Sequence, residues 1–317
     1  MTYILGIDTS AYTTSIALLD GENNKILADE RKVLEVKKGQ KGLRQQDAVF
    51  QHLKNFPELF QRINHDLSKV KIVSVSSRPR NVEGSYMPVF TVGQNFGRVI
   101  AKSLNCKYVE YSHQENHIAA SLIEDYKRVD KVIGVHLSGG TTEFIFARKS
   151  IKGFETEILG GTKDITFGQL IDRIGTLMDF PFPCGMHMEK YIEGKTFERM
   201  KTPPIRGDSF INLSGMENYY SNLYLNNKYT KESIIYSLFE YIGECIVHII
   251  NNLSSIQLNT VVISGGIASN KSIRNYIKSN IYDYEIIFPS VENSTDNGIG
   301  VALLPIIDRW YNEIKAD

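Results

Sequence analysis

The stretch ILGIDTSAYTTSIALLD, residues 4–20, decides the fold because the chain repeats its pattern. A second stretch, VIGVHLSGGTTEFIFAR, residues 132–148, aligns with it without a gap at an offset of 128 residues. Small polar residues coincide in the two copies, and most positions around them are apolar. The coincident pairs are Gly6 with Gly134, Ser10 with Ser138, Thr13 with Thr141 and Thr14 with Thr142. Each half is therefore predicted to begin with a strand, a small polar loop and a second strand.

The same order of elements continues after each copy. In the first half, the sequence pattern predicts strands at 3–7, 15–19, 26–36, 71–77 and 106–112 and helices at 50–63, 89–104 and 113–126. In the second half it predicts strands at 132–137, 143–148, 154–159 and 284–290, helices at 167–178, 231–253 and 294–311, and a strand, glycine turn and helix over 259–277. We therefore expect an α/β protein of two related subdomains, residues 1–128 and 129–317, with the last helix, about 296–317, packing back on the first.

The bulk composition excludes several classes of protein. Lysine plus arginine and aspartate plus glutamate are equal at 36 each, so no global field attracts nucleic acid or a membrane. The three cysteines form neither a disulfide framework nor a CxxC metal pair. No uncharged apolar run reaches the roughly 18 residues that span a bilayer, and the start lacks a signal-peptide pattern. A cytoplasmic protein that does not bind a membrane is expected.

Glycine, serine and threonine in the two loops indicate a ligand, because such loops leave backbone N–H groups and hydroxyls available for phosphate oxygens. A third turn of this kind follows at Ser264, Gly265 and Gly266. The duplicated arrangement resembles the actin-like, Hsp70-like and sugar-kinase superfamily, an RNase H-like fold in which two subdomains face each other around a nucleotide cleft. The alternative is that these loops are ordinary hairpin turns.

Two histidines mark a second candidate site. His113 and His117 lie four residues apart in HQENHIAA, so on a helix they share one face, with Cβ atoms about 5–6 Å apart. Neutral imidazoles in that arrangement suit zinc or iron. Asp296, in STDNGIG, is a candidate third ligand, but it precedes an apolar helix and is equally suited to an N-cap. Two surface histidines at the start of a helix are the alternative.

The segment from Asp164 to Gly185 suggests nucleotide contacts. Asp164, Gly168 and Asp172 step by four residues, so we expect them on one helix face, where an acidic group accepts hydrogen bonds from ribose hydroxyls. FPFPCG is expected to be a stiff loop whose Gly185 lets a ligand approach the backbone. A solvated acidic helix followed by a loop is the alternative.

Together these segments resemble the universal family of threonylcarbamoyl-adenosine synthases, long labelled glycoprotein endopeptidases. GIDTSAYTTSIALLD is similar to the family's opening strand-loop-strand, HQENHIAA to its metal-binding helix and HLSGGTTEF to its phosphate loop. IDRIGTLMDFPFPCG is similar to its nucleotide-binding segment, ISGGIASN to its adenosine turn and STDNGIG to the segment whose aspartate completes the metal site. The segments follow the family's order over nearly the whole chain.

The resemblance implies a set of site residues. It implies His113, His117 and Asp296 as the ligands of one divalent metal, iron or zinc. It implies contacts to an adenine nucleotide (AMP, ADP, ATP or an acyl-adenylate) from His136, Leu137, Ser138, Gly139, Gly140, Asp172, Gly185 and Asn270. In the family, a threonylcarbamoyl group moves from its adenylate to the N6 amine of the adenosine beside a tRNA anticodon. The resemblance thus also implies tRNA and a scaffold homologue of the same superfamily as partners.

The first loop departs from the family pattern. Where the family carries Cys-Asp-Glu or Cys-Asp-Asp, this chain has Ala11, Tyr12 and Thr13, so both acidic side chains are missing. Tyr12 and Thr13 are the candidates at the catalytic position, although neither serves as a carboxylate base near neutral pH. We expect a divergent paralogue that keeps the metal and nucleotide positions and uses a different acceptor.

Two other functions stay open. One is an inactive nucleotide-binding scaffold subunit, against which the retained metal ligands count. The other is a nucleotide-dependent kinase or ATPase, in which paired histidines are unexpected. Nucleic-acid binding has weak support from the sequence, because charged loops are usually only solvated. The two basic clusters are Lys37, Lys38, Lys41 and Arg44, and Arg78, Arg80 and Arg98.

Overall fold

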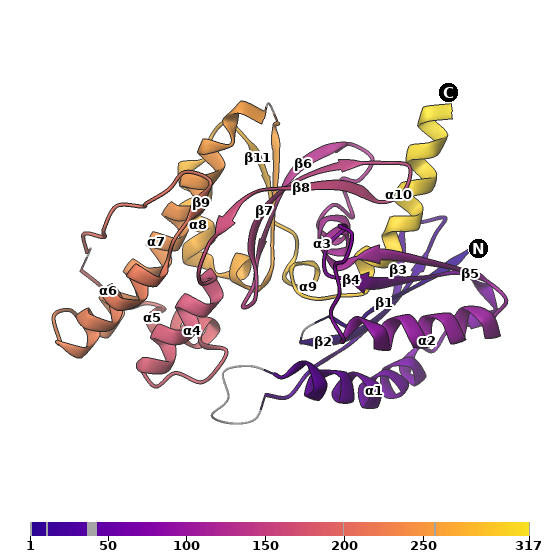
Figure 1. The fold of residues 1–317 in the computed structure, drawn as a ribbon, viewed down its shortest axis with the longest axis horizontal. Coiled ribbons are helices and arrows are strands. Elements are labelled where there is room, and N and C mark those ends of the chain that lie inside the picture. Colours follow the sequence, from indigo (N-terminus) through magenta and orange to yellow (C-terminus); the bar gives the residue numbers. More distant parts are fainter. Residues whose placement is uncertain (1, 11, 37–42, 199, 257, 317) are drawn as a thin grey trace. The chain divides into compact units, whose positions relative to one another are not determined.

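Two mixed sheets form the framework of the computed structural model, which describes residues 2–10, 12–36, 43–198, 200–256 and 258–316 (Figure 1). The first sheet has five strands, in the order β3 (Lys25–Val33), β2 (Thr13–Asp20), β1 (Tyr3–Asp8), β4 (Val70–Arg78) and β5 (Lys107–Ser112). The second has six, in the order β11 (Glu285–Ile287), β10 (Thr260–Ser264), β6 (Lys131–Leu137), β7 (Thr142–Lys149), β8 (Phe154–Thr162) and β9 (Phe210–Ile211).

The two sheets repeat one topology, as the duplicated sequence predicts. β2 pairs antiparallel with β1 and β3, and β4 and β5 add in parallel on the other side of β1. In the second sheet β6, β7 and β8 stand in the same order, and β10 and β11 add in parallel beside β6. In both copies the small polar loop therefore follows a central strand, which confirms the duplicated α/β fold.

The chain separates into two compact units. Unit 1 comprises Met1–Lys131, Ala147–Thr156 and Pro289–Asp317, and unit 2 comprises Val132–Phe146 and Glu157–Phe288. The predicted subdomain boundaries, and the cleft between the subdomains, stay predictions.

Helices cover both faces of the first sheet. α1 (Gln45–Arg62) and α2 (Phe90–Ser103) lie side by side on one face, and α3 (His113–Ser121) and α10 (Ile299–Ala316) pack on the other (Figure 1). The alternation of a strand explains this division, because Leu5 and Ile7 join the core under α1 and α2. Gly6, between them, faces α10 so closely that a Cβ atom would lie 2.7 Å from the Cβ of Ala302. Short helical segments complete this unit: 3-10 helix η1 (Leu67–Lys69) and α9 (Val291–Ser294).

Unit 2 packs its helices around one long apolar helix. That helix is α7 (Lys231–Asn252), as predicted. Among the described residues α7 alone is long and apolar enough to cross a membrane, but 78% of its apolar segment is buried inside the protein, so it is a core helix. The other helices of the unit are α4 (Phe167–Leu177), α5 (Cys184–Ile192), α6 (Ser214–Leu225), η2 (Ser254–Ile256), η3 (Gly266–Ser269) and α8 (Lys271–Asn280).

The predicted helix face of Asp164, Gly168 and Asp172 was wrong. Thr166 caps α4, since its side chain accepts a hydrogen bond from Gln169 N while the Gln169 side chain accepts one from Thr166 N. The helix therefore begins after Asp164, which lies outside it. Gly185 was also misplaced, because it lies in the first turn of α5 rather than in a loop.

Several element boundaries differ from the sequence prediction. α5, α6 and β9 were not predicted. α3 ends at Ser121 instead of residue 126, and α10 begins at Ile299 instead of residue 294. Neither α5 nor α6 has a side-chain cap at its own N-cap residue. Their starts are stabilised from elsewhere in the chain, so local sequence signals for them are weak.

Candidate functional site

Three candidate metal-ligand atoms from separate parts of the sequence meet in unit 1. His113 Nε2 lies 3.0 Å from His117 Nε2, and Asp296 Oδ1 lies 3.5 and 3.4 Å from those two atoms. With metal–ligand distances of about 2.1 Å, neighbouring ligands are about 3.4 Å apart in a tetrahedral site and about 3.0 Å apart in an octahedral one. The triangle of ligand atoms therefore fits a single metal ion, and the structure brings the three predicted ligands together.

The position of α3 presents both histidines to this point. Ser112 Oγ accepts a hydrogen bond from Glu115 N, and Ser112 N donates to Glu115 Oε2 at 2.7 Å, which forms a capping box. The other carboxylate oxygen of Glu115 accepts from Phe154 N at 3.0 Å and anchors the start of the helix. Since the helix begins at His113, His117 lies one turn further on the same face. The Ser-x-x-Glu spacing is a sequence signal for this start that was not part of the prediction.

Asp296 precedes α10 but does not cap it. Asn297 does so instead, because its Oδ1 accepts from Ile299 N at 2.9 Å, and the N-cap interpretation of Asp296 was wrong. Asn116 of α3 holds this loop, since its Nδ2 donates to Asn297 O at 2.6 Å and its Oδ1 accepts from Val301 N at 2.7 Å. These buried bonds hold the loop that carries Asp296, the candidate carboxylate ligand, against α3.

The first polar loop adds a second carboxylate that the sequence prediction missed. Asp8, the last residue of β1, is 0% exposed, and its Oδ1 lies 3.1 Å from His113 Nδ1. Its Oδ2 accepts hydrogen bonds from Ser10 Oγ at 2.5 Å and from Ser10 N at 3.3 Å. The carboxylate thus contacts the ring nitrogen of His113 that faces away from the cluster.

The electrostatics of the cluster favour a cation. Burial acts to lower the pKa of His113, but the charge of Asp8 and the hydrogen bond with Asp296 outweigh it and raise the pKa to about 10. Burial and the neighbouring His113 lower the pKa of His117. Burial acts to raise the pKa of Asp296, yet its hydrogen bonds with the two imidazoles hold that pKa well below its usual value. The buried carboxylate of Asp8 and the partly buried carboxylate of Asp296 need compensating positive charge, which a protonated His113 supplies in the metal-free protein and a divalent metal would supply when bound.

Another buried histidine lies under the first loop. His52 of α1 is 0% exposed, and its Nδ1 lies 2.8 Å from Thr14 Oγ1, which also accepts from Asn55 Nδ2 at 3.4 Å. Burial lowers the pKa of His52, although the charges of Asp8 and Asp296 act to raise it. His52 is therefore a neutral imidazole at pH 7. The sequence prediction missed it because the helical pattern was traced on apolar residues alone.

Tyr12 and Thr13 lie where the chain enters β2. Tyr12 O accepts a hydrogen bond from Leu34 N at 2.8 Å, and Thr13 pairs with Val33 of β3. Ala11 lies outside the described residues. A catalytic role for Tyr12 or Thr13 stays a prediction.

The second polar loop, in unit 2, is open. Ser138 N donates to Thr141 O at 2.8 Å and Thr141 N donates to Ser138 Oγ at 3.0 Å, which closes a tight turn. Gly139 and Gly140 are exposed, and within the described residues nothing lies within 4 Å of a Cβ built on either. Thr166, which caps α4, donates its hydroxyl to Gly139 O at 2.9 Å. The positive end of the α4 dipole therefore lies beside exposed backbone, an arrangement that favours an anion.

The other predicted nucleotide residues lie on neighbouring elements of unit 2. His136 of β6 pairs with Ser264 of β10, and Gly265 packs directly on Leu137. Asn270 caps α8, because its Oδ1 accepts from Ile273 N at 3.0 Å. The loop and the turn thus share the edge at which β6 and β10 end, the usual ligand edge of a parallel sheet.

The carboxylate of Asp172 already accepts a hydrogen bond from the protein backbone. Its Oδ1 accepts from Cys184 N at 2.8 Å, at the start of α5 beside Gly185, and burial raises its pKa. Since Asp172 and Asn270 both cap helices, their contacts to a nucleotide stay predictions, as do those of the loop from His136 to Gly140.

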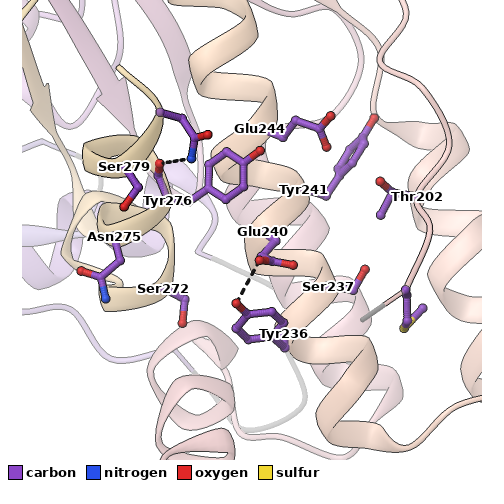
Figure 2. Close-up of a pocket in the computed structure, with 12 residues that line it drawn as sticks. Thr202, Tyr236, Ser237, Glu240, Tyr241, Glu244, Ser272, Asn275, Tyr276 and Ser279 are labelled. Carbon is purple, nitrogen blue, oxygen red and sulfur yellow. Dashed lines mark hydrogen bonds between the residues drawn. The ribbon is translucent and has the colours of Figure 1, made fainter. Parts of the chain in front are cut away.

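A separate pocket of about 650 Å³ opens between α7 and α8 (Figure 2). Glu240 and Glu244 of α7 line it opposite Tyr276 of α8, and Tyr236 donates to Glu240 at 2.9 Å. The pocket contains none of the predicted site residues.

The structure adds no support for nucleic-acid binding by the two basic clusters. Arg98 pairs with Glu110 at 2.9 Å. Lys37, Lys38 and Lys41 lie outside the described residues.

The fold defines a class of protein. HypF of T. kodakarensis has a TM-score of 0.64 at 14% identity, over 98% of this chain and 48% of that chain. An activator of 2-hydroxyisocaproyl-CoA dehydratase from Clostridium difficile, solved with bound ADPNP, has a TM-score of 0.55 at 14% identity, over 100% of this chain and 98% of that chain. A glucokinase of the ROK family from Streptomyces griseus has a TM-score of 0.53. The chain therefore has the actin-like, Hsp70-like and sugar-kinase fold that its duplicated loops predict.

Sequence comparison then identifies the family. The profile described as "TsaD: tRNA N6-adenosine threonylcarbamoyltransferase" matches residues 27–303. A tRNA N6-adenosine threonylcarbamoyltransferase of Mycoplasmopsis synoviae is 25% identical over 310 residues, covering 95% of this chain and 96% of that protein. The corresponding protein of a Sulfurihydrogenibium species is 28% identical over 315 residues, covering 94% and 88%. The chain belongs to the tRNA N6-adenosine threonylcarbamoyltransferase family, as its motifs predict.

Proposed function

We propose that this chain is a metal-dependent acyltransferase. It moves a threonylcarbamoyl group, or a related carbamoyl-type group, from its adenylate to an acceptor amine. Membership of the family makes the N6 amine of the tRNA adenosine beside the anticodon the first acceptor to test. The observation that supports the proposal most is the convergence of His113, His117 and Asp296, because a protein that serves only as a scaffold does not need three assembled ligands.

The reaction needs one group that polarises the carbonyl and another that binds the leaving phosphate. The acceptor nitrogen forms a bond to the carbamoyl carbon, the bond from that carbon to the phosphate oxygen breaks, AMP leaves and the amine loses a proton. A divalent metal supplies Lewis acidity for the carbonyl when it is bound. His113, His117 and Asp296 hold that ion, and the backbone N–H groups of Gly139 and Gly140 bind the leaving phosphate.

The acceptor is a second part of the proposal. Tyr12 and Thr13 occupy the place where the family carries acidic side chains, so the group that takes the amine proton differs here. We therefore propose an acceptor other than the family's tRNA adenosine. The test supplies threonylcarbamoyl-adenylate, tRNA and the family's partner subunits to the purified protein. Modification of tRNA at the rate of a family enzyme measured in parallel contradicts a different acceptor, and AMP release with another amine supports it.

Metal analysis with thermal shift separates the competing functions. The protein is purified without chelator, its metal is quantified, and its melting temperature is measured with AMP, ADP and ATP. Bound metal with stabilisation by nucleotide supports the transferase, and nucleotide stabilisation without metal favours a kinase or ATPase. Neither effect favours the scaffold subunit.

The partners and location proposed by family membership have their own tests. If tRNA is a ligand, its affinity falls steeply with salt, because bound phosphates release counterions. A flat salt response contradicts tRNA binding. A scaffold homologue of the same superfamily is the proposed protein partner, the proposed location is the cytoplasm, and the metal is iron or zinc.

A further inference from the structure

We infer that Asp8 is a positioning residue of the metal centre, an inference that rests on the proposed metal binding. Asp8 is not one of the three ligands. Its carboxylate lies 3.1 Å from Nδ1 of His113, while Nε2 of the same ring lies 3.0 Å from Nε2 of His117. One ring therefore joins the buried carboxylate on one side to the ligand cluster on the other.

The contact fixes the tautomer of His113. A carboxylate accepts hydrogen bonds and cannot donate one, so the ring must carry its proton on Nδ1. Nε2, which faces the other two ligand atoms, is then the nitrogen that gives its lone pair to a metal ion when one is bound, in place of its proton. Metal-binding histidines commonly donate their second nitrogen to a carboxylate in this way, which orients the ring and makes the ligand more basic.

Asp8 is itself held rigidly. It ends the central strand β1, it is fully buried, and Ser10 donates both a backbone N–H and a hydroxyl to its Oδ2. The oxygen that faces His113 is thus set by the strand and by the turn that follows it. Because neither oxygen can rotate without breaking these bonds, the ring of His113 is held with them.

Asp8 also balances charge. A divalent ion bound by two neutral imidazoles and the carboxylate of Asp296 would leave one uncompensated positive charge in a partly buried site. The carboxylate of Asp8 removes that excess, and an uncompensated buried charge is costly. Asp8 therefore raises metal affinity both by orienting a ligand and by neutralising the centre.

The test compares Asp8→Asn and Asp8→Ala with wild type. Asparagine keeps an oxygen that can accept from His113 and loses the charge, whereas alanine loses both. Chelator-treated protein is titrated with Zn²⁺ against a chromophoric chelator, and the visible absorption of the Co²⁺ form reports ligand geometry. We expect affinity to fall about 10-fold for asparagine and about 100-fold for alanine, with a changed Co²⁺ spectrum.

Asp308→Asn is the matched control. Asp308 is a half-buried carboxylate of the same unit, and it accepts from Tyr111 Oη at 2.6 Å and from Gly153 N at 2.6 Å instead of contacting a candidate ligand. This variant should keep wild-type Zn²⁺ affinity. Wild-type affinity and spectrum in both Asp8 variants overturn the inference while the metal proposal stands. Failure of wild type to bind Zn²⁺ or Co²⁺ overturns the metal proposal, and the inference with it.

A measurement on wild type covers the case in which the Asp8 variants do not fold. Protein with ¹⁵N-labelled histidine is loaded with Zn²⁺, and the imidazole nitrogens are assigned by NMR. We expect the proton of His113 on Nδ1 and the metal on Nε2. The opposite arrangement, with metal on Nδ1, overturns the inference without any substitution.

Discussion

The two polar loops begin from one sequence pattern and are used in opposite ways. In unit 1 the loop buries its side chains, with Asp8 at 0% and Ser10 at 1% exposure. In unit 2 the matching loop exposes its backbone at Gly139 and Gly140. The first loop therefore places a buried carboxylate next to the candidate metal ligands, and the second exposes main-chain N–H groups beside a helix terminus.

Comparison of the two copies shows which contacts are common to both loops and which belong to one loop alone. Thr14 and Thr142 occupy the same position, and each uses its hydroxyl to hold a nearby helix, through His52 of α1 and Phe167 N of α4 respectively. The differing residue Asp8 contacts His113, one of the candidate metal ligands, whereas its counterpart in the second copy is His136. In this comparison the shared threonines stabilise the fold, and the divergent residue Asp8 contacts a candidate metal ligand.

Removal of one candidate metal ligand should lower Zn²⁺ affinity, and this should be the largest of the predicted effects. If the affinity did not fall, the contrast between the two loops would lose its basis. His117→Ala leaves two of three ligands, so Zn²⁺ affinity should fall about 100-fold or more, about 3 kcal/mol. Competition with a chromophoric chelator measures this change. His65→Ala, which removes an exposed histidine of the same unit, is the control and should bind as wild type does. Equal affinity of His117→Ala and wild type contradicts the assignment.

Loss of the link between the ligand loop and α3 should be next in size. Asn116→Ala leaves Val301 N and Asn297 O buried without their present partner, which costs about 2–3 kcal/mol in the free energy of unfolding. Urea denaturation of the metal-free protein measures it. Asn312→Ala, at an exposed position of α10, should change stability by less than about 0.5 kcal/mol. If Asn116→Ala left the free energy of unfolding unchanged, the loop would have to be held by other contacts.

A smaller effect sharpens the account of the second loop. In Gly168→Ala the new Cβ would lie 2.5 Å from Gly139 Cα, so the loop must move. We expect this change to lower the free energy of unfolding by about 1–2 kcal/mol. Gly139→Ala meets open space and should leave stability unchanged while weakening nucleotide binding. Chemical denaturation and thermal shift with ADP distinguish the two variants. Full nucleotide stabilisation of Gly139→Ala would argue against a phosphate at this loop.

The smallest predicted effect depends on pH. Burial acts to raise the pKa of Asp164, but hydrogen bonds from Leu213 N and Ser214 N, at the start of α6, lower it to about 2. A lowered folded-state pKa stabilises the protein above the unfolded-state pKa of about 3.9, and this contribution is lost as pH falls through 2. Asp164→Ala should therefore cost about 1 kcal/mol at pH 7, as for a helix cap, and progressively less below about pH 4.

The control for this prediction is Asp283→Ala, at an exposed position of unit 2. It should show no such pH dependence. Stability curves of both variants between pH 7 and pH 2 are the measurement. A constant difference between Asp164→Ala and wild type over that range would contradict the capping role.

The periodicity of apolar residues predicted those strands and helices whose formation depends on neighbouring residues in the sequence. The duplicated strands and the apolar core helix α7 follow from periodicity, and the structure has both. α5 and α6 were missed because their starts are stabilised by distant carboxylates, Asp172 and Asp164, 12 and 50 residues earlier in the chain. No local cap at either start indicated a helix.

The candidate site divides in the same way. His113 and His117 follow from helical spacing, and Asp296 from the family motif. Asp8 and Asn116 were missed, because their partners lie 105 and 181 residues away in the sequence. Only the folded chain shows which side chains hold the ligands in place.

The central claim is that two imidazoles and one carboxylate of unit 1 bind one ion. Crystals grown with Zn²⁺ or Fe²⁺ and measured at the absorption edge of the metal test it most directly. We expect one anomalous peak about 2.0–2.2 Å from Nε2 of His113, Nε2 of His117 and a carboxylate oxygen of Asp296. A peak bound by other residues, or fully loaded crystals with no peak between these three side chains, would contradict it.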